Sequence, residues 1–337
     1  MNKILLSGFM LFVLAAGALT ENTGSAQETP KETFEERLGA DDGAALAVLF
    51  IANMRGNLGL CDCNHPRGGL ARRVGYVEGF KKKFPETPVI QVDAGHFWYT
   101  PSQDRLVTLQ NLKVAEAFSR FPVDVINLSR SDAIHARTLL AREGLAERTA
   151  QLPMLSNIIS ANGVFSADVS APAPYLIKEV TGPRIKGKNP IRIGFVGLAM
   201  PIKAEPGMRD ATVRNMFDSA RQIVVRARKE CDILIVVAHC ELEPAIRLAT
   251  ENPEADIVIA GDAEGLFKPR LVDKTLVVSA APGNIQQGDL RVYIDKDRKF
   301  RFKVLSTDLD EVVPSNPAAK EFSDKASREL DRLKFGP

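Results

Sequence analysis

The chain has 337 residues, of which 45% are apolar and 26% are charged. This composition is typical of a globular protein and excludes a chain that is disordered throughout, because such chains combine low hydrophobicity with high net charge. The 44 lysines and arginines nearly balance the 42 aspartates and glutamates, which leaves a net charge of +2. That charge gives no sign of the basic surface that nucleic-acid binding requires. We therefore expect a folded protein with no nucleic-acid partner.

The first 26 residues have the pattern of a secretory signal peptide. Lys3 is followed by an apolar run from Ile4 to Ala18 and then by the small residues at 24–26, which is typical of a cleaved signal. A membrane anchor is the alternative, but the run is shorter than the roughly 20 apolar residues that a membrane span needs. We therefore predict that residues 1–26 are a signal peptide. The mature protein is expected to be periplasmic or secreted, with no membrane attachment after cleavage.

The mature chain alternates strand-like and helix-like segments. Residues 27–43 are a polar leader, and the first buried strand follows at 44–52. Further strands are predicted at 88–95, 124–129, 191–199, 232–239, 256–261 and 275–281, helices at 70–84, 106–121, 212–229 and 244–250, and edge strands and loops at 153–190. The last two strand-like runs predict a hairpin around 296–298, and a charged amphipathic helix begins at Pro317.

This alternation indicates an α/β fold. We predict one domain over residues 44–308 and a C-terminal helical tail over 309–337. In open α/β sheets, ligands bind in the loops that follow the carboxyl ends of the strands. Three of the four histidines and three of the four cysteines lie at such predicted strand ends, so we expect the functional site at this edge.

The same strand ends carry a family resemblance. GGLARR follows the first strand, and VDAG, INL, IRIGFVGL, VVAH and IAG come later in that order. This succession, over about Ala44 to Asp308, resembles the calcineurin-like metallophosphoesterases of the periplasmic 5′-nucleotidase type. The resemblance implies a four-layer α/β/β/α sandwich. It covers only the N-terminal catalytic domain of such nucleotidases, without the C-terminal substrate-binding domain that many of them carry.

The resemblance also implies a phosphoric ester hydrolase in which two metal ions hold an activated water and the phosphoryl oxygens. Five motifs supply the family's ligands, and most of them are altered in this chain. In the first motif, Asn53 and Arg55 replace an aspartate and a histidine. In the second, which contains Asp93, the bridging aspartate is replaced by His96.

The remaining motifs depart from the family pattern in the same way. The third motif, Gly-Asn-His-Glu, falls on Ser129, Arg130, Ser131 and Asp132, which removes both the asparagine ligand and the assisting histidine. The fourth motif keeps its histidine at His239. The fifth has Asp262 and Glu264 in place of two histidines. We therefore expect little two-metal hydrolysis, and we assign no catalytic residue.

Two hypotheses remain for this edge of the sheets. In the first, the polar side chains are a relic of a lost metal centre. In the second, they form a rebuilt site for one divalent ion of the zinc or manganese class, since mixed histidine and carboxylate ligands suit such ions. The rebuilt site would consist of His96, His239, Asp262 and Glu264. It requires that neither Arg55 nor Arg130 lies between these ligands.

A thiol cluster is the second candidate site. Cys61, Cys63 and His65 alternate along one segment, so in an extended conformation their side chains point the same way. Cys240 follows another strand. Three interpretations compete: a soft-metal site, a disulfide or redox-active pair, and a structural bridge from this loop to Cys240. Export favours a structural disulfide, and we expect Cys231 to be a buried free thiol.

A third candidate lies at the GGLARR segment. Gly68 and Gly69 allow backbone amides to approach an anion at a helix N-terminus, where Arg72 and Arg73 offer further donors. The alternative, which we favour, is a tight turn followed by a solvated basic helix face.

Taken together, these patterns predict a binding or accessory protein with a decayed or rebuilt metal centre. Its partner would be a small phosphorylated ligand or another protein. The alternatives are an active phosphoesterase on nucleotides or other phosphomonoesters that uses an altered metal site, and a thiol-based metal or redox module.

Overall fold

Two six-stranded β-sheets lie at the centre of the structure, which is a computed structural model. The structure describes residues 32–99, 105–185, 189–201, 213–263, 268–280 and 282–335. The chain divides into two units, Met1–Glu32 and Thr33–Pro337, and both sheets belong to the second. The predicted signal peptide lies outside the described residues.

The first sheet has the strand order β12-β11-β1-β2-β3-β4. Its strands are β1 (Leu46–Ile51), β2 (Val89–Asp93), β3 (Val125–Asn127), β4 (Ile158–Ile159), β11 (Gln286–Ile294) and β12 (Phe300–Asp308). Strands β1 to β4 are parallel, whereas β11 pairs antiparallel with β1 and then with β12. Every residue of β1 is buried, which explains why this strand is a continuous apolar run rather than an alternating one.

The second sheet has the order β5-β6-β7-β8-β10-β9. Its strands are β5 (Tyr175–Val180), β6 (Ile191–Ala199), β7 (Ile233–His239), β8 (Ile257–Ala260), β9 (Arg270–Val272) and β10 (Thr275–Ser279). Strands β6, β7, β8 and β10 are parallel, and the two edge strands are antiparallel to their neighbours. All seven residues of β7 are buried, so the end of this strand is a rigid position for a functional side chain.

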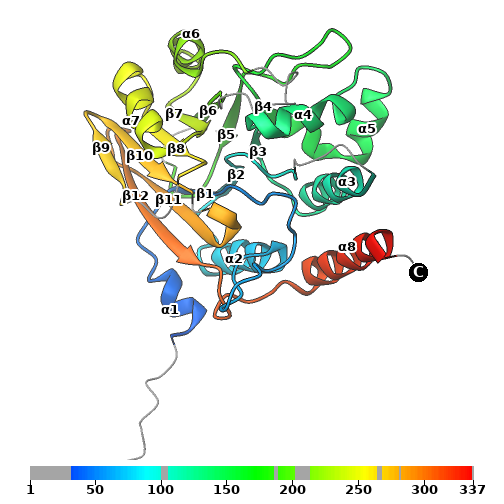
Figure 1. The fold of residues 1–337 in the computed structure, drawn as a ribbon. Helices are drawn as coiled ribbons and strands as arrows, with labels where there is room; N and C mark the ends of the chain where they lie inside the picture. Colours follow the sequence, from blue (N-terminus) through cyan, green and yellow to red (C-terminus); the bar gives the residue numbers. More distant parts are fainter. Residues whose placement is uncertain are drawn as a thin grey trace, which may run out of the picture. The chain divides into compact units, whose positions relative to one another are not determined.

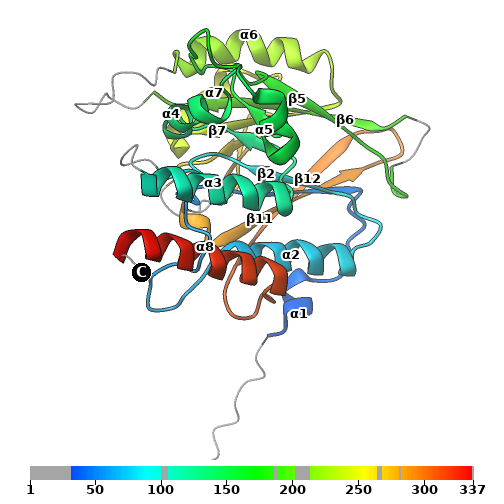
Figure 2. The same ribbon diagram turned by 90° about the vertical axis from the view of Figure 1, so that its right-hand side faces the viewer.

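The helices cover the outer faces of the two sheets, as Figure 1 and Figure 2 show. They are α1 (Phe34–Leu38), α2 (Leu70–Lys83), α3 (Arg105–Arg120), α4 (Arg130–Leu139), α5 (Leu145–Gln151), α6 (Met216–Arg228), α7 (Leu242–Glu251) and α8 (Pro317–Phe335), with short 3-10 turns η1 (Pro153–Asn157) and η2 (Pro282–Asn284). Helices α2, α3, α4 and α8 share an apolar cluster with the first sheet, and α6 and α7 share one with the second.

Between the sheets lies a third apolar cluster that takes side chains from both. Phe50 of β1 and Phe195 of β6, for example, belong to it and are almost fully buried. The four layers of helix, sheet, sheet and helix confirm the predicted α/β/β/α sandwich. Among the described residues, no helix combines the length and the apolar character that crossing a membrane requires.

The predicted strands and the hairpin are present within a few residues of their expected bounds. Three helices, α1, α4 and α5, and the short edge strand β9 were not predicted. Helix α1 lies in the segment expected to be a polar leader, where Thr33 and Glu36 form a capping box and Phe34 packs edge-on against Tyr76 of α2. The C-terminal helix α8 contributes Ala319 and Ala326 to the apolar cluster on the first sheet.

Candidate functional site

The loops that follow β1 and β2 run side by side and bring the first two motif positions together. The amides of Asn53 and Arg55 donate to the carbonyl oxygens of Gly95 and His96, each at 2.9 Å. The amide of Gly56 continues the pairing by donating to Phe97 at 2.8 Å. Because these bonds are backbone bonds, they hold Arg55 beside His96 whatever the side chains do.

Three residues of this edge have a left-handed backbone conformation. The φ angles are 59° at Asn53, 49° at Arg55 and 59° at His96. Residues other than glycine adopt this conformation at a cost of about 1–3 kcal/mol each, and such residues cluster at functional sites. Three of the six described non-glycine residues with positive φ therefore lie at the sequence-predicted edge.

His239, the retained motif residue, ends β7 and is held by Asn53. Its Nε2 atom lies 3.2 Å from Oδ1 of Asn53, while Nδ2 of Asn53 donates to the carbonyl oxygen of Gly261 at 2.5 Å. A carbonyl oxygen can only accept, so the bond to Gly261 fixes which end of the amide faces the imidazole. His239 therefore donates from Nε2, and this nitrogen has no free lone pair for a metal.

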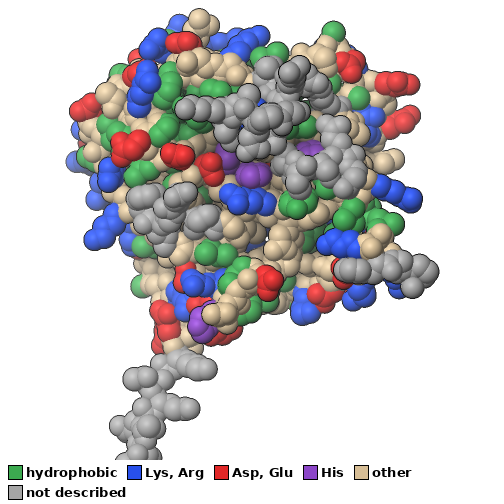
Figure 3. All heavy atoms as spheres, in the orientation of Figure 1, with side chains coloured by type: hydrophobic (Ala, Val, Ile, Leu, Met, Phe, Trp, Pro, Cys, Tyr) green, Lys and Arg blue, Asp and Glu red, His purple; other side chains and the backbone are tan. Residues whose placement is uncertain are grey.

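His96 and Asp262 complete the group around His239. The rings of His96 and His239 meet edge to face with centroids 5.6 Å apart, and Oδ1 of Asp262 lies 3.9 Å from Nε2 of His239. His239 is buried, His96 is largely covered and the Asp262 side chain is half-buried. In Figure 3, histidine, basic and acidic side chains gather near the middle of the face shown.

The electrostatics of the group keep both histidines neutral. The pKa of His96 is lowered to about 4, mainly by burial and in addition by His239 and Arg55. Burial lowers the pKa of His239 to about 3, and Arg55 lowers it further. Burial also raises the pKa of Asp262, although His96 and Arg55 oppose this. Arg55 therefore acts on all three groups, and it supplies a positive charge where the resemblance places a metal ligand.

Helix α4 presents its N-terminus to the same edge. Asp132 is fully buried and accepts hydrogen bonds from the amides of His96 at 2.6 Å and Trp98 at 3.0 Å. It also accepts from the hydroxyl of Ser129, whose oxygen in turn accepts from the amide of Asp132 and so caps the helix. Burial raises the pKa of Asp132 to about 6. This motif position therefore holds the His96 loop in place instead of facing a ligand.

The other residues of the third motif, Arg130 and Ser131, are the first two residues of helix α4. Arg130 is its first residue and is buried, while Ser131 is half-buried. Among the described residues, Arg130 forms no ion pair with Asp262. Glu264 lies outside the described residues. The predicted set is thus brought together at His96, His239 and Asp262, with Arg55 nearby.

Asp93 and Arg73 lie beneath this edge and differ from the sequence interpretation. Arg73 was expected on a solvated helix face or at an anion site, but its side chain is fully buried. Its charge lowers the pKa of Asp93, yet burial dominates and raises that pKa to about 8. The periodicity of α2 could have shown this, because Arg73 shares a face with the buried residues Leu70, Val77 and Phe80.

The glycines of the GGLARR segment serve the fold. Gly68 and Gly69 have φ angles of 76° and 82°, and a Cβ atom on Gly68 would lie 2.6 Å from the carbonyl oxygen of Asn284. The amide of Gly68 donates to Leu309 at 2.8 Å, and Arg72 donates to the carbonyl oxygens of Pro66 and Leu309. The Gly68 amide and the Arg72 side chain are therefore engaged within the chain rather than with an anion.

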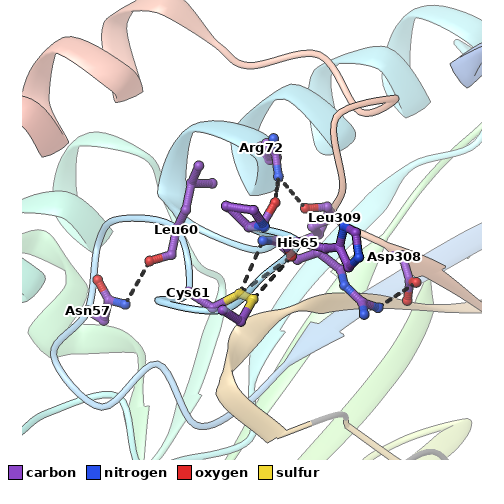
Figure 4. Close-up of a disulfide and its surroundings, with 10 residues drawn as sticks. Asn57, Leu60, Cys61, His65, Arg72, Asp308 and Leu309 are labelled. Carbon is purple, nitrogen blue, oxygen red and sulfur yellow. Dashed lines mark hydrogen bonds and ion pairs between the residues drawn. A yellow bond between two sulfur atoms is a disulfide. The ribbon is translucent and has the colours of Figure 1, made fainter.

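The thiol cluster contains a disulfide between Cys61 and Cys63 (Figure 4). Cys240 is a buried free cysteine, so the bridge from the loop to Cys240 that the sequence suggested is absent. Cys231 is also buried and free, as expected. The imidazole of His65 is exposed on the same loop.

The donor set does not fit two metal ions. Across the described ranges, no three histidine, cysteine, aspartate or glutamate side chains are placed to hold a metal ion together. His239 donates from the nitrogen that would coordinate, and Arg55 adds a cation. We therefore derive no metal-dependent step from these residues.

Comparisons with known proteins agree with this architecture. No family model matches the chain. An uncharacterized metallophosphoesterase of Bacillus subtilis, YunD, is 23% identical over 186 residues, which are 54% of this chain and 38% of that protein.

Solved structures give the fold more completely. The chain is similar to a 5′-nucleotidase precursor from Thermus thermophilus (TM-score 0.67, 18% identity) and to the NAD nucleotidase of Haemophilus influenzae (TM-score 0.66, 16% identity), and each match covers 86% of this chain and 60% of the other. It is also similar to the calcineurin-like phosphoesterase YfkN from Bacillus subtilis (TM-score 0.62, 16% identity), with 86% and 99% covered. The chain therefore has the calcineurin-like phosphoesterase fold, which confirms the resemblance, and it spans about three fifths of the two nucleotidases.

Proposed function

We propose that this chain is an exported protein of the calcineurin-like phosphoesterase fold that binds a small phosphorylated ligand without two-metal hydrolysis. The observation that carries the proposal is the position of Arg55. Its backbone is tied to His96 by a 2.9 Å hydrogen bond, and its charge acts on His96, His239 and Asp262. A guanidinium at this place attracts the phosphate that metal ions would otherwise hold.

The groups around Arg55 can help to bind an anion. Both histidines are neutral at pH 7 because their pKa values lie near 4 and 3, and a neutral imidazole still offers one N–H donor. The N-terminus of α4, with Arg130 as its first residue, contributes the positive end of a helix dipole. Export is proposed from the signal-like residues 1–26.

Binding of adenosine monophosphate and of inorganic phosphate, measured by calorimetry, tests the proposal. Arg55→Ala should weaken binding of both at least tenfold. Arg221→Ala, which removes an exposed arginine of α6, is the matched control and should leave the affinity unchanged. Binding that survives Arg55→Ala contradicts the proposal. So does manganese-dependent turnover of phosphomonoesters at about 1 per second or more, a rate typical of enzymes.

A phosphoesterase with a single metal ion is the second candidate. It is favoured by the proximity of His239 Nε2 and Asp262 Oδ1, which lie 3.9 Å apart; two ligands at about 2.0–2.2 Å from one tetrahedral zinc ion lie about 3.3–3.6 Å apart, so these two atoms would have to move closer by a few tenths of an ångström. His239 would first have to break its hydrogen bond to Asn53. Elemental analysis decides between the two functions: a stoichiometric metal that is lost in Asp262→Asn supports the second.

A further inference from the structure

The Cys61–Cys63 disulfide closes a very short loop at the surface. The two cysteines are separated by only two positions, Cys63 is exposed and Cys61 is half-buried. A disulfide stabilises a protein mainly by restricting the unfolded chain, and this effect shrinks with the length of the closed loop. So short a loop gives little stability, and the placement calls for another explanation.

Other bonds already hold the loop that carries the disulfide. The amide of Cys61 donates to the carbonyl oxygen of Arg67 at 2.8 Å, and the amide of Leu70 donates to Leu58 at 2.9 Å. The side chain of Arg67 forms an ion pair with Asp308 at 2.8 Å. Figure 4 shows the ion pair at Asp308 close to the disulfide. We therefore expect the loop to keep its fold when the disulfide opens.

The two sulfur atoms have different surroundings. The amide of Arg67 donates to Cys61 Sγ at 3.2 Å, and a donor of this kind stabilises a thiolate. The carbonyl oxygen of His65 lies 3.1 Å from Cys63 Sγ and farther away, at 3.9 Å, from Cys61 Sγ. At the shorter distance it can accept a hydrogen bond from a thiol, and it disfavours a thiolate at Cys63 more than at Cys61. Once reduced, Cys61 is the better thiolate and Cys63 the better thiol.

We propose that Cys61 and Cys63 form a redox-active pair that exchanges with an external dithiol. The thiolate of the partner attacks the exposed Cys63 sulfur, a mixed disulfide forms there, and Cys61 leaves as a thiolate. The second thiol of the partner then attacks its own sulfur in the mixed disulfide and releases Cys63, which takes up a proton. The partner's second thiol gives up its proton and the partner ends as a disulfide, while this chain gains two electrons and, once the Cys61 thiolate is also protonated, two protons.

The other two cysteines do not compete in this exchange. Cys231 and Cys240 are buried. Burial raises the pKa of both thiols, which disfavours the reactive thiolate.

The first test is reduction of the folded protein with dithiothreitol, followed by alkylation and mass analysis. Without denaturant, we expect millimolar reductant to expose two thiols, at Cys61 and Cys63, within minutes, and oxidised glutathione to restore the disulfide. The midpoint of thermal unfolding should shift by a few degrees at most. A disulfide that is reduced only in denaturant, or a reduced protein that has lost its cooperative unfolding transition, overturns the proposal.

The double variant Cys61→Ser/Cys63→Ser provides a control for the fold. It should unfold at nearly the temperature of the parent, because the loop has other anchors. A double variant that fails to fold identifies the disulfide as structural and contradicts the proposal.

The second test assigns the two sulfurs. Oxidised protein is mixed briefly with glutathione and quenched in acid, and the mixed disulfide is mapped by mass. We expect glutathione on Cys63 with Cys61 free, and in the reduced protein we expect Cys61 to alkylate at lower pH than Cys63. Glutathione on Cys61, or equal alkylation profiles, contradicts the assignment of Cys61 as the leaving group. A purely structural disulfide would yield no mixed disulfide.

Discussion

Nε2 of His239 and Oδ1 of Asn53 lie 3.2 Å apart, and this contact joins the ends of strands from two different sheets. The amide of Asn53 is fixed from its other side by Gly261, so the histidine becomes a donor. An aspartate at position 53 could accept from the histidine in the same way, but its negative charge would also attract a cation. The neutral amide of Asn53 therefore accepts from His239 without supplying the negative charge that would hold a metal ion.

Replacing Asn53 and Arg55 by the metal-ligating residues of the family pattern should raise metal binding. In Asn53→Asp/Arg55→His, a carboxylate and an imidazole, both of which can bind a metal ion, replace the amide and the guanidinium. We expect manganese affinity to rise at least about 10-fold, the scale on which changes around a metal act, as measured by equilibrium dialysis. Asn53→Asp alone is the control, because it keeps the repelling charge of Arg55. If the double variant binds no more metal than the parent, these two residues are not what prevents binding.

Acid should weaken the protein through His96. Its pKa falls from 6.5 in the unfolded chain to about 4 in the fold, so between these values only the unfolded chain binds the proton. The contribution of His96 to stability is present above pH 6.5 and is lost as the pH falls toward 4, by up to about 1.4 kcal/mol per pH unit. His96→Gln should flatten this part of the urea-unfolding profile. The exposed His65 is the control, and His65→Gln with the same effect would refute the assignment.

Rising pH should lower the stability of the protein through Asp93, whereas falling pH lowers it through His96. Burial raises its pKa from 3.8 to about 8, so the folded protein keeps a proton that the unfolded chain has released. The contribution of Asp93 is present below pH 3.8 and is lost as the pH rises through 8. Asp93→Asn should therefore make the free energy of unfolding less dependent on pH over pH 5–8, a window of about three units. Asp331→Asn, on the exposed face of α8, should leave the profile unchanged.

Substituting Asp132 in the cap of helix α4 should lower the free energy of unfolding more than substituting Ser129. Asp132→Ala leaves the buried amides of His96 and Trp98 without their acceptor, and we expect a loss of about 3 kcal/mol in the free energy of unfolding. Ser129→Ala should cost about 1 kcal/mol, as other capping residues do. Ser131→Ala, directly before Asp132, should change the free energy of unfolding by no more than about 0.5 kcal/mol. Equal losses for all three would show that the carboxylate of Asp132 does not hold the His96 loop.

Central strands such as β1 and β7 were predictable from the sequence because they are continuous buried apolar runs. Two of the missed helices, α1 and α4, carried a visible signal, since Thr33 with Glu36 and Ser129 with Asp132 each have capping-box spacing. Local spacing showed which strand ends carry polar residues. It could not show that Arg55 lies against His96, because that contact depends on hydrogen bonds between two loops.

The cysteines show a different limit of sequence analysis. Four cysteines allow several pairings, and composition does not choose among them. The structure pairs Cys61 with its near neighbour Cys63 and leaves Cys240 buried beneath the site edge. Likewise, the charge of Arg73 predicts a surface residue, although its place on the apolar face of α2 decides its burial.

The antiparallel pairing of β11 with β1 has a consequence for how the protein is made. The side chain of Gln287 donates to the carbonyl oxygen of Phe50 at 3.1 Å across 237 positions of sequence. During synthesis, β1 emerges long before this partner, so one edge of it stays unsatisfied until most of the chain is available. Contacts of such high contact order form slowly and leave intermediates with exposed strand edges. We therefore expect slow folding and a need for chaperones that shield the nascent chain until the hairpin docks.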